Sequence, residues 1–433
     1  MIPSLRERTL TESGRRRTFS EGRLLAVSAV VKLLKEHDWI LVGSAFLLTA
    51  IGALLIYSAQ HAMPDARDRI LWSRQLTWWG MATAAFVIAV WLPLRLHEVF
   101  AYVYLVAVGL ALLALVTLGI GTSGQWISLG PAYIQPSEPA KLALLIALSR
   151  YLAYLKRPVI SPNPLLALSV LIVPIWFLVI KQPDLGTSLV FWALFLVMLF
   201  WAGAPLPALF LLISPALSLV LAFNWIVWTL FFITLLLILW HERPRLPISV
   251  GVVTLNLIFG IVTPILWNRL MPYQKMRILV FLDPGMDPRG AGYQIIQSKV
   301  AIGSGGLWGK GFLEGTQTGL HFLPEKHTDF IFAVGGEEFG FWGALLILVL
   351  FGILLWRIID AAHLARNRFS QFLAAGTAGI IAFQVLVNIG MTLGLMPVTG
   401  LPLPFVSYGG SSLVLFWILI GLVVNVRRHW QEY

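Results

Sequence analysis

The chain has 433 residues, of which 58% are hydrophobic and only 12% are charged, and its formal net charge is +11 at pH 7. A soluble globular domain has about a quarter of its residues charged, so this composition excludes an ordinary soluble protein and indicates a polytopic membrane protein. The chain contains no cysteine, which excludes disulfide bonds, thiolate metal sites and cysteine nucleophiles.

The N-terminal 38 residues are rich in arginine. They contain no short apolar core followed by a cleavage site, so residues 1–38 are expected to be a cytoplasmic tail rather than a signal peptide. Within this tail, residues 24–35 have an apolar helical face with Lys32 and Lys35, which predicts an interfacial helix at the inner leaflet. The other Lys and Arg residues lie mostly in short loops, as membrane orientation requires, and we therefore expect no nucleic-acid partner.

Twelve apolar segments follow, each about long enough to cross the hydrocarbon core as a helix. The predicted fold is an all-α polytopic integral membrane protein with about 10–12 transmembrane helices. An even number of spans puts both termini on one side, and the basic loops on that side place it in the cytoplasm. The predicted spans are 39–58, 74–92, 99–119, 138–155, 163–181, 186–203, 206–222, 224–240, 248–269, 337–358, 371–391 and 410–426.

A single transmembrane domain is predicted over residues 39–433, with a large extracytoplasmic loop at about 270–336. Such a loop is too long for a simple connector, and its aromatic residues among many glycines favour an ordered, re-entrant or interfacial segment. Its stretch GSGGLWGKG is similar to a phosphate-binding loop, but the spacing is one residue short and no βα unit surrounds it, so nucleotide binding is excluded.

Ionisable residues close to the hydrocarbon core are costly and are therefore functional candidates. In QPSEPAKLALL, Glu138 and Lys141 lie three residues apart on one helical face at the mouth of a span. They could bind a substrate or form a structural ion pair. In KQPDLGTSL, Asp184 could line an outward-facing cavity that binds the substrate, or it could only cap the next helix.

Further polar residues lie before the last spans. In LPEKHTDF, His327 and Asp329 could bind a substrate, or serve as an interfacial hydrogen-bonding group and a helix N-cap. In PLPFVSYGGSS, Ser407 precedes two glycines, which could expose backbone amides to an anion or sugar or allow close helix packing. Asp283 and Asp287 belong to Asp-Pro pairs, which also signal turns, and for Asp283 the turn is preferred.

Five of these stretches, in chain order, resemble the SEDS family (shape, elongation, division and sporulation), and QSKVAIGSGGLWGKG looks more like its RodA branch than its FtsW branch. The stretches are QPSEPAKL, KQPDLGTSLV, DPRGAGYQIIQSKVAIGSGGLWGKGFLEGTQ, FLPEKHTDFIFAV and LPLPFVSYGGSS. The resemblance implies a peptidoglycan glycosyltransferase that polymerises lipid II at the outer face of the bacterial inner membrane, for cell elongation and rod shape. It also implies a class B penicillin-binding protein, a transpeptidase, as partner.

The span count departs from the family pattern. Most members have about ten spans, with a single helix before the catalytic loop, whereas residues 204–269 supply three here. We interpret this as an inserted helix pair within 204–245. An inserted pair preserves sidedness, so the large loop still falls on the outer side.

The resemblance also assigns residues. It implies that the essential carboxylate of the large loop is Asp287, within the pattern Asp-Pro-x-Gly-x-Gly-Tyr, here DPRGAGY. The family's Ser-Glu-x-x-Lys matches Glu138 and Lys141, and its Gln-Pro-Asp-Leu-Gly matches Asp184. Our hypothesis is that Asp287 is the general base for the acceptor hydroxyl, in a single displacement with inversion.

Lys141, with Arg74, would offset the charge that grows on the leaving pyrophosphate, and Glu138 would position Lys141. Asp184, His327, Asp329 and Ser407 would bind substrate or shape the cavity rim. A Mg²⁺ or Mn²⁺ ion, with Asp287 as a candidate ligand, could share the electrostatic work, and no organic cofactor is expected.

Two other classes of function fit the sequence. A lipid II flippase would also place a polar cavity in a twelve-span bundle, and a non-catalytic scaffold for a transpeptidase would make the carboxylates dispensable. A carrier needs polar groups that continue toward the inner side. The inner halves of the predicted spans are almost wholly apolar, and this favours the enzyme.

Overall fold

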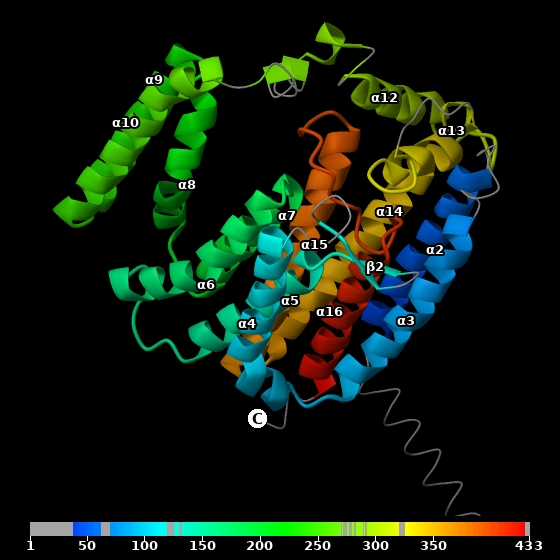
Figure 1. Cartoon of the computed structure of the whole chain (residues 1–433), viewed down its shortest axis with the longest axis horizontal. Coiled ribbons are helices and arrows are strands. Elements are labelled where there is room, and N and C mark those ends of the chain that lie inside the picture. The colour runs from blue at the N-terminus through cyan, green and yellow to red at the C-terminus, as the bar shows by residue number, and fades with distance from the viewer. Residues whose placement is uncertain are drawn as a thin grey trace, which may run out of the picture.

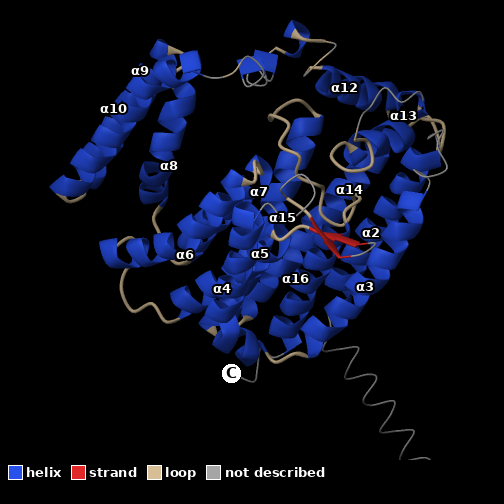
Figure 2. Ribbon diagram, in the orientation of Figure 1, coloured by secondary structure: helices blue, strands red, loops and turns tan. Residues whose placement is uncertain are grey.

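The structure, a computed structural model, describes residues 38–61, 70–118, 125–129, 132–269, 271, 275–276, 279–280, 283–288, 290, 292–319 and 325–428. Apart from Asp38, the predicted cytoplasmic tail and its interfacial helix lie outside these residues. The described chain is almost wholly helical (Figure 2). Its one sheet is a two-stranded antiparallel hairpin of β1 (Ile127–Leu129) and β2 (Ala132–Ile134).

Twelve helices of 16 to 34 residues occupy the described chain at the positions of the twelve predicted spans. Eight of them are both long and apolar enough to cross a membrane, and α3, α5, α7 and α8 are shorter or less apolar. The predicted all-α membrane fold is confirmed. The helices are α2 (Trp39–His61), α3 (Leu71–Trp91), α4 (Leu94–Leu118), α5 (Ser137–Ala153), α6 (Pro162–Lys181), α7 (Leu185–Trp201), α8 (Leu206–Leu221), α9 (Trp225–Glu242), α10 (Leu246–Arg269), α14 (Ile331–Leu364), α15 (Arg368–Thr392) and α16 (Gly410–Arg428).

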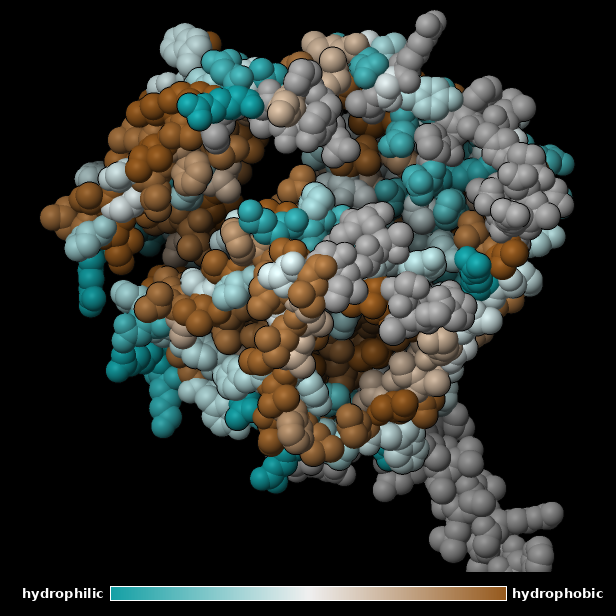
Figure 3. Space-filling view, viewed as in Figure 1, coloured by the Kyte–Doolittle hydropathy of each residue, from teal (hydrophilic) through white to brown (hydrophobic). Residues whose placement is uncertain are grey.

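The core of the bundle forms around α15 and α16. In each of these helices 78% of the most apolar stretch is buried inside the protein, compared with 11% in α9 and α10. Figure 1 shows α15 and α16 surrounded by α2, α3, α5 and α14, while α8, α9 and α10 stand apart at the upper left. The apolar surface of α9 and α10 is brown in Figure 3, as expected of helices that face lipid.

Helices α8, α9 and α10 are held together by a small apolar cluster around Leu211, Leu235 and Leu239 and by polar contacts. Asn256 Nδ2 donates to Ser214 Oγ at 2.8 Å, and Ser218 Oγ donates to the Asn256 carbonyl at 2.9 Å. Trp228 Nε1 donates to Ser218 Oγ at 2.7 Å. Since lipid provides little hydrophobic drive for helix association, such bonds between helices stabilise this unit.

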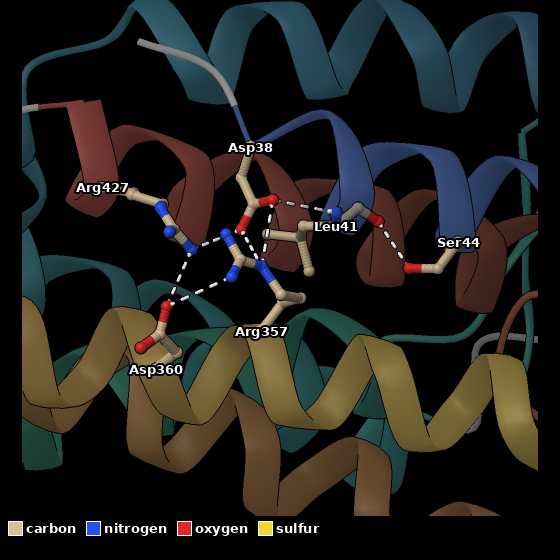
Figure 4. A network of polar contacts seen from close by, with 6 residues as sticks. All are labelled: Asp38, Leu41, Ser44, Arg357, Asp360 and Arg427. Carbon is tan, nitrogen blue, oxygen red and sulfur yellow. Dashed lines mark hydrogen bonds and ion pairs between the residues drawn. The ribbon is translucent and has the colours of Figure 1, made fainter. Parts of the chain in front are cut away.

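The two ends of the bundle differ in character. We call the end where α3, α5, α7, α14 and α16 begin the loop end, and the opposite end the basic end. At the basic end the buried Asp38 carboxylate accepts from Arg357 Nε at 2.9 Å and from Arg427 at 2.5 Å, and it also caps α2 through the Leu41 amide at 3.2 Å (Figure 4). Asp360 adds a second contact to Arg427 at 3.2 Å. This network ties α2, α14 and α16 together.

Helix α14 is broken at Gly340, which has φ 63° and ψ −158°. A break in a membrane helix frees backbone groups that must find other partners, because lipid offers none. The Phe341 amide donates to the Gly306 carbonyl at 2.9 Å, and the Trp342 amide donates to the Leu307 carbonyl at 3.4 Å. Both acceptors lie in the large loop, directly after α12 (Tyr293–Gly305).

The carbonyls that these amides would reach in an unbroken helix are occupied by the same loop. The Glu337 carbonyl accepts from the Lys310 amide and the Glu338 carbonyl from the Gly311 amide, each at 3.0 Å. Two helical bonds are therefore replaced by four bonds to residues 306–311, which we call the docked segment. This segment completes the backbone hydrogen bonding of α14 at its break.

Glycine is required where the docked segment meets α14. A Cβ on Gly305 or Gly309 would overlap the backbone of residues 336–340, and one on Gly340 would overlap Gly309 and Leu307. Gly309 and Gly340 also have positive φ angles, which other residues rarely adopt. Gly305 and Gly309, which give GSGGLWGKG its similarity to a phosphate loop, thus allow close contact between two backbones.

Replacing Gly340 should test this arrangement. We expect Gly340→Ala to lower the free energy of unfolding by roughly 1–3 kcal/mol from backbone strain alone, with further loss from the overlap. Gly352→Ala is the matched control, because this glycine lies in the same helix with no neighbouring atom near its Cβ position. The control should be neutral or slightly stabilising. Thermal unfolding of the detergent-solubilised variants measures both effects, and equal stability of the two variants would contradict the docking.

Candidate active site

The first turn of α5 carries a buried ion pair. Lys141 Nζ lies 2.6 Å from Glu138 Oε1, and the two side chains are 0% and 4% exposed. The predicted pairing therefore forms. Glu138 Oε2 is buried and has no hydrogen-bond partner among the described residues, so the pair keeps one free acceptor at the loop end.

Asp184 lies beside this turn and caps α7. Its Oδ1 accepts from the Thr187 amide at 2.9 Å, and its Oδ2 accepts from Gln135 at 2.9 Å and from Ser137 at 3.2 Å. The carboxylate thus joins the start of α7 to the start of α5 and brings Asp184 next to Glu138. The capping role considered from the sequence is confirmed, and a direct role with substrate stays a prediction.

The segment before α14 is tied to the segment before α16. Ser407 Oγ donates to the Thr328 carbonyl at 2.5 Å and accepts from the Leu403 amide at 2.8 Å. The Tyr408 amide donates to the His327 carbonyl at 2.9 Å, and the two rings lie 5.8 Å apart. Ser407 and His327 are therefore brought together. The Ser407 hydroxyl is used within the protein, and its role in substrate binding stays a prediction.

Asp329 lies in the same region but does not cap α14. The residue at the N-cap position is Phe330, and no side chain caps this helix end. Asn388 of α15 donates to the Asp329 carbonyl at 3.0 Å and to the Leu401 carbonyl at 2.8 Å. The expected N-cap alternative for Asp329 is therefore wrong, because the helix starts one residue later and the Asp329 backbone is held by α15.

The segment around Leu401 also contacts α7. A Cβ on Gly186 would overlap the Thr399 carbonyl and the Leu401 side chain, so the start of α7 packs closely there. The segment therefore contacts the start of α7, which Asp184 caps, and shares Asn388 as a hydrogen-bond donor with the Asp329 backbone.

Arg74 joins the site from α3. Its guanidinium is hydrogen bonded to the Tyr408 side chain, and the residue itself is exposed. Burial raises the pKa of the Tyr408 phenol, and the charge of Arg74 opposes this rise. Arg74 is thus an exposed cation, whereas Lys141 is a buried one.

Asp287 is half-buried and lies in a tight turn before α12. Its Oδ1 accepts from the Gly290 amide at 2.9 Å, and its carbonyl accepts from the Gly292 amide at 3.0 Å. A Cβ on Gly292 would overlap the carbonyls of Pro284 and Asp287. The glycines of DPRGAGY are therefore required to fold the chain around the Asp287 carboxylate. Arg289 lies outside the described residues.

Asp283 is part of the same turn. Its Oδ1 accepts from the Gly285 amide at 2.9 Å at the start of η2 (Pro284–Met286). The turn role expected for Asp283 is confirmed.

Helix α12 connects Asp287 to the bundle. Ser298 Oγ donates to the Thr392 carbonyl of α15 at 2.8 Å, and the docked segment follows α12 directly. Figure 1 shows α12 above the upper ends of α14 and α15. Asp287 therefore lies at the loop end beside α12, which is fixed to the bundle through Ser298 and through the docked segment. The other candidate residues belong to the bundle helices or to the segments directly before them.

Two buried carboxylates were not predicted as site residues. The fully buried Glu337 accepts from Lys310 Nζ at 3.0 Å, from the Gln317 amide at 2.8 Å, and from the amide and hydroxyl of Thr318 at 3.1 and 2.9 Å. Glu338 accepts from the Ser58 hydroxyl of α2. Their signal in the sequence was a pair of acids beside an apolar run. The observed bonds assign them to anchoring the loop, including α13 (Thr316–Gly319), on α14 and α2.

Lys326 completes this anchor. It is 3% exposed, and its Nζ donates to the Thr318 carbonyl at 2.6 Å. Burial lowers the pKa of Lys326 to about 8, although Glu337 and Glu338 oppose the shift. The anchor also explains why α14 begins at Ile331, six residues before the predicted start of this span: Glu337 and Glu338 are buried and hydrogen bonded inside the protein, so the helix continues on their N-terminal side.

No cluster of three or more His, Asp or Glu side chains that could hold a metal ion occurs in the described part of the chain. A Mg²⁺ or Mn²⁺ ion near Asp287 would therefore need most of its ligands from substrate and water. Magnesium commonly binds in this way, through one or two carboxylates and substrate phosphates.

The family model FTSW_RODA_SPOVE, described as cell cycle protein, matches residues 38–231 and 228–432. The chain belongs to this family. It is 38% identical over 388 residues to "Peptidoglycan glycosyltransferase MrdB" of Escherichia coli (strain K12), covering 88% of this chain and 93% of that one.

Two solved structures of family relatives support the same fold. One comes from work described as "Structural coordination of polymerization and crosslinking by a peptidoglycan synthase complex", with a TM-score of 0.67, 32% identity, and 92% and 99% of the two chains covered. The other is "Thermus thermophilus Rod shape determining protein RodA", with a TM-score of 0.59, 29% identity, and 92% and 98% covered. The resemblance to the SEDS family and its RodA branch is confirmed.

The environment of Asp329 predicts a pH-dependent stability. Burial raises the pKa of Asp329 to about 6 from an ordinary value of 3.8, Glu325 adds to the rise, and a hydrogen bond from Thr328 opposes it. Between these two pH values the folded protein binds more protons than the unfolded chain, so the contribution of this residue to stability falls as pH rises from 4 to 6.

We expect Asp329→Asn to remove this contribution. Its melting temperature relative to the wild type should increase as pH rises from about 4 to about 7 and then level off. Thermal unfolding at several pH values measures the difference, with Asp283→Asn as the control for an exposed turn carboxylate. A difference that is the same at every pH would contradict the assignment.

Proposed function

We propose that this protein is a peptidoglycan glycosyltransferase that polymerises lipid II into glycan strands for cell elongation and rod shape. One observation carries the proposal. The DPRGAGY turn holds the Asp287 carboxylate at the loop end, next to α12, which is fixed to α14 and α15. A relative in the same family is named a peptidoglycan glycosyltransferase. The same end gathers the cations and hydrogen-bonding groups that an anionic lipid-linked sugar requires.

In this reaction the 4-hydroxyl oxygen of the acceptor sugar attacks the anomeric carbon of the donor. The bond from that carbon to the pyrophosphate oxygen breaks, and lipid pyrophosphate leaves with the electron pair. Asp287 takes the hydroxyl proton as general base. Since a single carboxylate acts, without a covalent glycosyl intermediate, the anomeric configuration inverts.

The cations stabilise the leaving pyrophosphate. Arg74 is exposed at the rim and can meet the phosphate oxygens directly. Lys141 is fully buried against Glu138, so its charge acts on the pyrophosphate through the protein rather than by direct contact, and Glu138 holds it in place. Fixed positive charge in a site that excludes water often supplies the largest catalytic contribution.

A divalent cation bound to the pyrophosphate, with Asp287 as its one protein ligand, would supply additional charge neutralisation. No step above depends on it. Asp184, His327, Asp329 and Ser407 bind substrate or shape its site, with Asp184 joining the starts of α5 and α7 and Ser407 joining the segments before α14 and α16.

The active site is assigned to the extracytoplasmic face of the bacterial inner membrane, and both termini to the cytoplasm. The support is the excess of Arg and Lys at the basic end, which follows the positive-inside rule. The partner is a class B penicillin-binding protein that crosslinks the glycan, since a solved relative belongs to a complex described as coordinating polymerisation and crosslinking.

A flippase is the less favoured alternative. Transport would require the basic end to open, whereas the buried Asp38 holds α14 and α16 together there through Arg357 and Arg427. A non-catalytic scaffold for a transpeptidase is also less favoured, because a scaffold would not need a buried lysine and its ion pair at the loop end.

Asp287→Asn tests the general base directly. Asparagine can keep the turn but cannot accept the proton, so we expect glycan formation from purified lipid II to fall by about 10²- to 10⁴-fold. Asp283→Asn is the matched control, since this carboxylate belongs to the same turn and is exposed, and it should retain activity. The assay uses the detergent-solubilised protein with and without its transpeptidase partner, and an active, folded Asp287→Asn enzyme would overturn the assignment.

A double substitution separates the catalytic role of Lys141 from a structural one. Lys141→Met alone should lower the free energy of unfolding by about 3–5 kcal/mol, because Glu138 is left buried and unpaired. Adding Glu138→Gln should restore most of this stability. If Lys141 serves the pyrophosphate, the stable double variant should still polymerise at least about 100-fold more slowly. A double variant with the wild-type rate would show that the pair is only structural.

A further inference from the structure

A cavity of about 370 Å³ lies at the basic end, where α4 begins and α5 ends. It is far from the candidate active site along α5, because Glu138 and Lys141 belong to the first turn of this helix. Its wall combines three tyrosines with three cations: Tyr102, Tyr151, Tyr154, Arg150, Lys156 and Arg157.

Arg150 is fixed in the wall of this cavity. Its NH1 donates to the Glu98 carbonyl at 2.7 Å and to the Val99 carbonyl at 2.6 Å. Its guanidinium also lies 5.0 Å from the centre of the Tyr102 ring. Within the described chain, Arg150 has no carboxylate partner, and its Nε and NH2 make no hydrogen bond. Two nitrogens of a pre-positioned guanidinium, Nε and NH2, are therefore available to an anion.

Lys156 and Arg157 supply two more positive charges at the mouth. Both are exposed, and neither forms an ion pair with another described residue. The one nearby carboxylate, Glu98, is hydrogen bonded to the Tyr154 hydroxyl. The cavity thus has a positive balance, and Tyr154, which is 69% exposed, has the aromatic and polar character that favours the membrane interface.

The surface next to the cavity is apolar. Val99, Val103 and Val106 of α4 are 54%, 58% and 60% exposed. Their spacing places them on one face of the helix, which runs from the cavity toward the middle of the bundle. Figure 3 shows hydrophilic side chains at the lower left, over the connection between α5 and α6, and apolar surface above them.

We propose that this cavity binds the phosphate of an anionic phospholipid headgroup from the inner leaflet. Arg150 contacts the phosphate through its free donors, Lys156 and Arg157 neutralise the headgroup charge, and the acyl chains lie along the exposed valines of α4. Basic pockets between membrane helices on the cytoplasmic side are a recognised setting for such lipids. The apolar face beside the cations favours a lipid over free phosphate or an acidic protein segment.

The assignment to the inner leaflet rests on the orientation given under Proposed function, but the binding itself does not require enzymatic activity. A bound lipid would join α4 to α5, and α5 is the helix whose other end carries Lys141.

Native mass spectrometry of the delipidated full-length protein tests the proposal. Phosphatidylglycerol and phosphatidylethanolamine with identical acyl chains are the probes, and inorganic phosphate is the third ligand. We expect phosphatidylglycerol to bind at least about fivefold more tightly than phosphatidylethanolamine, and inorganic phosphate to bind far more weakly than either.

The variant for this test is Lys156→Gln/Arg157→Gln. Its matched control is Arg243→Gln/Arg245→Gln, which removes two cations from the connection between α9 and α10 at the same end of the bundle. The first variant should bind phosphatidylglycerol on the order of 25-fold more weakly, about fivefold per cation, and the control should stay within twofold of the wild type. Arg150→Lys should also weaken binding, because it keeps the charge and loses the planar donors.

Three results would overturn the proposal: equal losses in the variant and its control, equal affinity for the two lipids, or inorganic phosphate binding as tightly as phosphatidylglycerol. Thermal unfolding of each variant shows that it is folded. This binding experiment contains no lipid II, so its result does not depend on the polymerisation assay. A protein that binds phosphatidylglycerol here but makes no glycan in that assay would refute the proposed function and leave the lipid site standing.

Discussion

The backbone of α14 must be satisfied in a lipid environment, and the rest of the loop end depends on how this is done. Gly340 breaks the helix, and residues 306–311 replace the lost bonds with four of their own. Lipid cannot hydrogen bond to a broken helix, so the break and the docked segment are stable only together. A loop that would otherwise be a long connection thereby becomes part of the bundle.

This arrangement links the fold to the chemistry. The docked segment directly follows α12, and α12 begins directly after the turn that holds Asp287. Glu337 and Lys326 fix the chain that follows, at Thr318, so the loop is held on both sides of the docked segment. A general base must be positioned to within a fraction of an ångström. Asp287 lies outside the transmembrane helices, and α14 helps to position it. The backbone bonding of α14 is in turn complete only when the docked segment is in place.

Much of the architecture could be predicted from the sequence, because apolar periodicity and capping are local properties. The twelve helices, the Glu138–Lys141 pair and the cap formed by Asp184 all follow from residues a few positions apart. The docked segment could not be predicted, since it pairs residues about thirty positions apart through backbone atoms, and its glycines gave only a misleading similarity to a phosphate loop. The role of Glu337 was not predicted, and the N-cap alternative for Asp329 was wrong, for a related reason. Their roles depend on partners in other elements, such as Thr318 and Asn388.

Hydrogen exchange of the backbone amides, measured in lipid nanodiscs, tests the docking most directly. We expect the amides of Lys310, Gly311, Phe341 and Trp342 to exchange slowly, at rates similar to those inside α14, because all four are bonded across the break. Fast exchange at Lys310 and Gly311, in a protein whose α14 amides are otherwise protected, would contradict it. The large loop would then be a separate element, and the position of Asp287 would need another explanation.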